Sequence, residues 1–125
     1  MRYVYLLAVM VALPTIAAAQ SMNAEVFHKR ATALQKKGPL ALFHRGEIEA
    51  LMAEGQAAGK RANANRLATV RAGGKPRYCP PEGPRSMNSN EFMNGLAAIP
   101  RRDRTAIDMT EATTRIVAKK YPCPA

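Results

Sequence analysis

The chain is poor in aromatic residues. Its 125 residues contain no tryptophan, three phenylalanines and four tyrosines, while alanine is frequent throughout. β-Sandwiches and β-barrels are rich in aromatic and β-branched residues, so this composition argues against both. Because 47% of the residues are nevertheless hydrophobic, we do not expect a disordered chain. The length corresponds to a single domain.

Cysteine and histidine are also scarce, with two of each. Two cysteines are too few for a zinc ribbon or an iron–sulfur site built by this chain alone. His28 and His44 lie on separate segments, without cysteine or acidic residues at metal-binding spacings. The sequence also lacks a glycine-rich phosphate loop, a serine-centred nucleophile elbow and a paired-carboxylate motif. We therefore expect no metal, no cofactor and no enzymatic activity.

The N-terminus has the order of a secretory signal. A positive residue, Arg2, precedes the uninterrupted apolar run Val4–Leu13, and the small residues Ala17–Ala19 follow. This pattern predicts a signal peptide over residues 1–19 and a mature single domain over residues 20–125, located in the periplasm or secreted. The apolar run is shorter than the roughly 20 residues that span a bilayer. No later segment is apolar enough to cross one, so no transmembrane segment is expected after cleavage.

Export would place the two cysteines in an oxidising compartment, where Cys79 and Cys123 are expected to form a disulfide. The bond would close a loop of about 45 residues, for which the chain-entropy model gives a stabilisation of about 4 kcal/mol. The alternative is a redox-active or nucleophilic thiol. This alternative is less favoured, because neither cysteine has a second cysteine or a general base beside it.

The apolar spacing predicts an all-α domain, a small bundle of about four helices. The expected ranges are residues 23–37, 47–72, 88–99 and 108–120. The last two helices begin with Asn88 and Asp108, each followed three residues later by a glutamate, as in a capping box. Prolines make residues 76–84 a rigid loop. Since Cys79 precedes the third helix and Cys123 follows the fourth, we expect a C-terminal helical hairpin stapled by the disulfide.

Two details of this pattern leave alternatives. Gly55 and Gly59 allow a close helix crossing, within the monomer or across a dimer, or are simply tolerated at the surface. The helix-poor segment 63–65 allows a break in the second helix. Without a break, Arg66 falls on the apolar side, which would indicate a functional arginine. The segment 101–104, Arg-Arg-Asp-Arg, is expected to be an exposed turn.

Positive charge dominates: the formal net charge is +10, and no acidic residue occurs between residues 55 and 81. This stretch carries the cations Lys60, Arg61, Arg66, Arg71, Lys75 and Arg77. Nucleic acid is not the expected partner, because the protein is exported and the stretch lacks interleaved aromatic residues for base stacking. One hypothesis is that the first four of these cations bind an anionic polymer or lipid head groups of the cell envelope. A solvated face that only aids solubility is the alternative.

The C-terminal half carries the short motifs Tyr78-Cys79-Pro80-Pro81, Glu91-Phe92-Met93, Ile99-Pro100, Ile116-Val117 and Tyr121-Pro122-Cys123. Over residues 78–123 this order resembles the Rap/Tai family, immunity proteins of type VI secretion. The resemblance implies a small, all-helical periplasmic protein with a disulfide between Cys79 and Cys123. It also implies binding and inhibition of a peptidoglycan amidase effector, often by a homodimer. The first half departs from the family pattern, since it lacks a cysteine pair and a Tyr-x-x-Gly segment that members usually have there.

The leading hypothesis is therefore a periplasmic binding protein whose partner is a protein, an amidase effector if the resemblance extends to function. Inhibition of this type requires a rigid protruding loop, which residues 75–87 or 100–107 can supply. The candidate contact residues on these loops are the cations Lys75, Arg77, Arg85, Arg101 and Arg102.

Overall fold

The computed structural model describes residues 21–83 and 85–125, so the predicted signal peptide, residues 1–19, lies outside the described part of the chain. The described residues form, in order, α1 (Ala24–Lys36), the 3₁₀ helix η1 (Gly38–His44), α2 (Arg45–Arg71), α3 (Ser89–Ala98), α4 (Arg101–Arg104) and α5 (Met109–Lys120). Within these ranges there is no strand, only one isolated bridge between Asn23 and Asp108. The predicted all-α class is confirmed.

The side chains of Asn23, Asn88 and Asp108 cap the starts of α1, α3 and α5. They accept backbone hydrogen bonds from Glu25 and Val26 (to Asn23, 3.0 and 3.2 Å), from Glu91 (to Asn88, 2.8 Å) and from Glu111 (to Asp108, 2.9 Å). Such caps satisfy N–H groups that the first turn of a helix leaves without a partner. The predicted starts of these three helices are therefore confirmed, and so is the side-chain capping that was expected to produce them.

The second predicted helix is a single element. α2 runs without interruption through residues 63–65, so the break allowed by this segment does not occur. Ala58 and Ala62 are buried on α2, and the most extensive packing of this helix is against α5. These tertiary contacts outweigh the weak helix propensity of the two asparagines in the segment.

Gly55 and Gly59 do not mark a helix crossing within the described chain. A Cβ atom added at either glycine would meet no atom within 4 Å. The close approach occurs at Gly95 of α3, where an added Cβ would lie 2.9 Å from Cγ2 of Ile116 on α5. The absence of a side chain at Gly95 therefore lets α3 and α5 pack closely.

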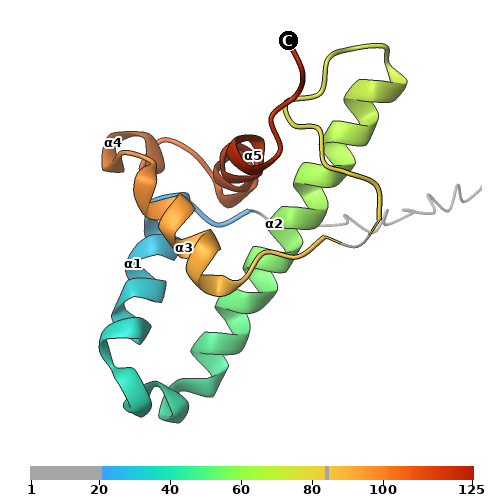
Figure 1. The fold of residues 1–125 in the computed structure, drawn as a ribbon. Coiled ribbons are helices and arrows are strands. Elements are labelled where there is room, and N and C mark those ends of the chain that lie inside the picture. The colour runs from blue at the N-terminus through green and yellow to red at the C-terminus, as the bar shows by residue number, and fades with distance from the viewer. Residues whose placement is uncertain (1–20, 84) are drawn as a thin grey trace, which may run out of the picture.

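The core lies where α1, α2, α3 and α5 converge (Figure 1). Leu96 of α3 and Met109 of α5 are its largest fully buried side chains. Phe27 of α1 and Phe92 of α3 meet edge to face, with ring centroids 6.1 Å apart, a favourable arrangement for aromatic pairs. α5 contacts α3, as the expected hairpin requires, but its most extensive packing is against α2.

The prediction of an exposed turn over residues 101–104 is wrong for Arg104. The segment forms one helical turn, α4, in which Arg104 is only 8% exposed. Its Nε donates to the Glu25 carboxylate at 2.7 Å, and its Nη1 donates to the carbonyl oxygen of Ile99 at 2.5 Å. Arg101 and Arg102 remain exposed. Which arginine turns inward depends on where α1 places Glu25, a residue distant in the sequence.

Candidate functional site: a cationic segment anchored by the disulfide

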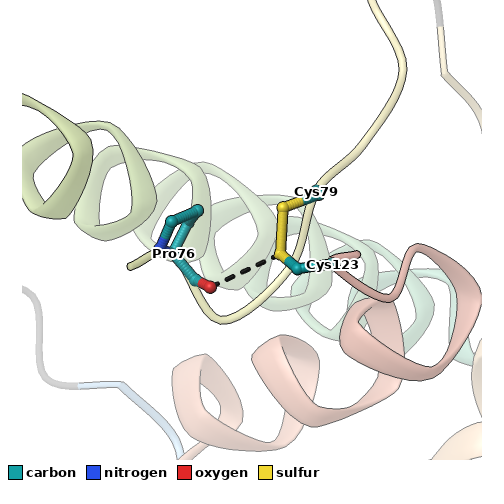
Figure 2. The surroundings of a disulfide bond; sticks show 3 residues. All are labelled: Pro76, Cys79 and Cys123. Atoms are coloured by element: carbon teal, nitrogen blue, oxygen red, sulfur yellow. Dashed lines mark hydrogen bonds between the residues drawn. A yellow bond between two sulfur atoms is a disulfide. The ribbon is translucent and has the colours of Figure 1, made fainter. Parts of the chain in front are cut away.

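The segment that joins α2 to α3 is held at its middle by the predicted disulfide. Cys79 is bonded to Cys123, and the Cys79 backbone N–H donates to the carbonyl oxygen of Tyr121 at 2.8 Å. The carbonyl oxygen of Pro76 lies 3.4 Å from the Cys123 sulfur (Figure 2). A disulfide sulfur carries no hydrogen, so this is a close sulfur–oxygen contact rather than a hydrogen bond. Two chain segments 44 positions apart are thereby joined at one end of the molecule.

Tyr78 provides a second anchor for the same segment. Its side chain is only 6% exposed. The guanidinium of Arg66 lies over the ring, 5.5 Å from its centroid, a distance suited to a cation–π contact. Arg66 also donates from Nη2 to Asn63 at 2.9 Å. Arg66, which we expected to be a functional arginine if α2 did not break, therefore has a structural contact that holds Tyr78.

Arg77 provides a third anchor. Its two terminal nitrogens donate to the Glu111 carboxylate at 2.5 and 2.8 Å, and Arg115 donates to the same carboxylate at 3.0 Å. The hydrogen bond from Arg77 is the main cause that lowers the pKa of Glu111, and the same bond raises the pKa of Arg77. The Arg77 side chain is still 56% exposed. It can touch a partner, but its charge is already largely balanced within the protein.

A polar pocket of about 250 Å³ lies at the base of this segment, between α2 and α5. Arg66, Arg77 and Tyr78 line one part of it, and Asp108 and Glu111 line another. The pocket thus holds charges of both signs. The buried Nε of Arg66 has no hydrogen-bond partner in the described part of the chain. The arrangement suits a polar side chain of a partner better than a strongly charged one.

The structure separates the residues proposed to contact a protein partner. Lys75 and Arg85 are exposed on the segment between α2 and α3, on either side of the disulfide. Arg101 and Arg102 belong to α4, which Figure 1 shows on the opposite side of the molecule. Arg101 lies 3.7 Å from the Glu25 carboxylate. The two predicted loops therefore cannot act as one surface, and the segment around the disulfide carries the larger share of the candidates.

The basic stretch proposed to bind anionic polymer is not one free patch. Arg61 donates to the hydroxyl of Thr110 at 2.7 Å and to the Glu54 carboxylate at 2.9 Å. Arg66 is engaged with Tyr78, as described above. The two cations of this group that stay exposed are Lys60 and Arg71. Half of the proposed patch is thus used to hold the fold.

An apolar groove of about 550 Å³ opens between α1, α2 and α3, and sequence reasoning did not predict it. Its lining includes Phe27, Leu34, Met52, Phe92 and Met93. The spacing of apolar residues in the sequence identifies most of these as core-facing residues. It does not indicate that a groove opens between the helices that carry them. Gly55 and Gly59 lie along the groove, and their missing side chains leave it open.

The described residues contain no group of three or more His, Cys, Asp or Glu side chains that could hold a metal ion. Among the helices of residues 21–83 and 85–125, none is both long and apolar enough to span a membrane. Comparison of the chain with known protein families, with curated proteins and with solved structures found no match.

Proposed function

We propose that this protein is a small exported binding protein that inhibits a peptidoglycan amidase, as the immunity proteins it resembles do. The observation that carries the proposal is that the described residues Gly73–Gly83 and Arg85–Met87 are cationic, mostly exposed and anchored before any partner binds. In this proposal the protein binds an enzyme and is not an enzyme itself.

Anchoring matters because a flexible segment loses conformational freedom when it binds. Each side chain immobilised at an interface costs roughly 0.5–1.5 kcal/mol, and a rigid segment avoids part of this cost. The disulfide, the buried Tyr78 and the Arg77–Glu111 pair hold this segment at three consecutive positions. Gly73, with a φ of 78°, turns the chain out of α2 just before them. The geometry thus suits insertion into the cleft of a partner.

Charge favours an acidic partner surface. Arg71, Lys75 and Arg85 are exposed along the end of α2 and the segment that follows. Complementary charges accelerate association and select among partners. Binding of anionic polymer through Lys60, Arg61, Arg66 and Arg71 is the weaker proposal, because Arg61 and Arg66 already bind other parts of the chain.

The test is binding and inhibition of an amidase encoded beside the gene for this protein. We expect the two proteins to co-purify, and Lys75→Ala with Arg85→Ala to weaken binding about tenfold or more, as hot-spot residues do. Lys119→Ala, an exposed cation of α5, is the matched control and should leave binding unchanged. If Arg101→Ala with Arg102→Ala weakens binding instead, the α4 side makes the contact. Retention of no envelope hydrolase, together with no inhibition, would refute the proposal.

A further inference from the structure

The turn between α1 and α2 exposes three large apolar side chains. Leu40, Leu42 and Phe43 are 62%, 66% and 84% exposed. None of the seven residues of η1 is buried, and η1 packs mainly on α1 and α2. Figure 1 shows this turn at the end of the molecule opposite the C-terminus. We call residues Gly38–His44 the apolar tip. Such clusters on a small protein usually mark an interaction surface.

Local geometry gives the apolar tip its shape. Gly38 has a φ of 54°, and Pro39 follows it at the start of η1, so α1 ends and the chain reverses within a few residues. Immediately behind the tip, Arg30 of α1 donates two hydrogen bonds to the Glu47 carboxylate of α2, at 2.6 and 2.7 Å. This bidentate ion pair links α1 to α2 near the turn that connects them. The apolar side chains therefore lie on a turn whose two flanking helices are joined by an ion pair.

Cations flank the apolar tip on both sides in the sequence. Lys36 and Lys37 precede it, Arg45 follows it, and all three are exposed. No acidic residue occurs from residue 26 to residue 46. A surface that places large apolar side chains at its centre and cations at its edge matches the boundary of an anionic bilayer, where acyl chains lie beneath phosphates.

We propose that the apolar tip docks on a bilayer containing anionic phospholipid. Leu40, Leu42 and Phe43 enter the boundary between head groups and acyl chains, while the flanking lysines and Arg45 contact phosphates. A symmetric contact between two tips is disfavoured, because it would bring the same cations of both copies together. This inference does not depend on the inhibitor proposal, since the tip lies far from the disulfide-anchored segment (Figure 1).

The test is co-sedimentation with vesicles of phosphatidylglycerol and phosphatidylcholine, compared with phosphatidylcholine alone. The unmodified protein and all variants are purified with the same N-terminal residue. We expect binding to the anionic vesicles only. Lys36→Gln with Lys37→Gln should lower the partition coefficient at least about tenfold, since each cation near such a surface contributes a factor of about five. Arg71→Gln with Lys75→Gln removes two exposed cations at the other end of the molecule and should have little effect.

A second pair of variants tests the apolar contribution. Leu42→Ser with Phe43→Ser should lower the partition coefficient by about tenfold or more, because both side chains lose the apolar burial that insertion would provide. Val70→Ser, at a position 48% exposed on α2, is the matched control. Unchanged thermal unfolding confirms that the tip variants fold. Absence of vesicle binding, or equal losses in tip and control variants, would overturn the proposal. A change of oligomeric state in the tip variant without vesicles would also overturn it, because the tip would then be a contact between copies of the chain.

Discussion

The carboxylate of Glu25 and the guanidinium of Arg104 form a buried ion pair at 2.7 Å, although the residues are 79 positions apart. Their side chains are 8% and 9% exposed. Arg104 also donates to the carbonyl oxygen of Ile99 at the end of α3. One side chain of α4 thereby connects α1 with α3 on the side of the molecule away from the disulfide.

Removal of one partner from this pair should be costly. Arg104→Ala would leave the Glu25 carboxylate buried without its cation, and we expect a loss of about 3 kcal/mol in the free energy of unfolding. Arg102→Ala, on the same helical turn but exposed, should change it by less than about 0.5 kcal/mol. Urea unfolding of both variants measures the difference. Equal effects of the two substitutions would show that the buried pair does not stabilise the fold.

Stability should fall as the solution becomes acidic. Hydrogen bonds from arginine are the main cause that lowers the pKa of three carboxyl groups, which are Glu25, Glu47 and Glu111. In the unfolded chain these groups titrate near their ordinary pKa, about 4.3. The folded state therefore binds fewer protons, and the stabilisation is complete above about pH 5 and is lost as the pH falls through the lowered folded values.

Unfolding titrations between neutral pH and about pH 3 would measure this dependence. Glu111→Gln should reduce the slope of stability against pH, because Gln keeps the shape and does not titrate. A slope that is the same in the parent and in Glu111→Gln would contradict the assignment.

The disulfide should contribute a large part of the total stability. Cys79→Ser with Cys123→Ser should lower the free energy of unfolding by about 4 kcal/mol, because the unfolded chain regains the freedom of a long loop. A reductant should destabilise the parent by a similar amount and leave the double variant unaffected. Intact-mass analysis of the exported protein should show two hydrogens fewer than the reduced form, and a start after residue 19.

The glycines of α2 and α3 should respond oppositely to alanine. Gly95→Ala places a Cβ 2.9 Å from Ile116, and the resulting overpacking should cost about 1–3 kcal/mol. Gly55→Ala and Gly59→Ala meet no atom within 4 Å and should each stabilise α2 by up to about 1 kcal/mol. Thermal unfolding of the three variants distinguishes these effects. Destabilisation by Gly55→Ala or Gly59→Ala would instead indicate that a second copy packs on this face.

Local chemistry was enough to predict the four longer α-helices and the caps of three of them, while the bond between Cys79 and Cys123 was expected from predicted export and from the presence of only two cysteines. Asn23, Asn88 and Asp108 act on N–H groups two or three residues away, and prolines exclude helix over residues 76–84 whatever the rest of the chain does. Each of these effects acts between residues that are close together in the sequence. The sequence alone is therefore enough to predict them.

The roles of individual charges depend on contacts between distant segments. Nothing near Arg104 in the sequence distinguishes it from Arg101, yet the position of Glu25 makes one buried and leaves the other exposed. Arg61 and Arg66 look like members of a basic patch until Thr110 and Tyr78 are brought beside them. The apolar groove and the exposure of the apolar tip likewise depend on how distant segments of the chain pack together. Burial is a property of the assembled helices, because an apolar side chain is covered only if another element packs over it.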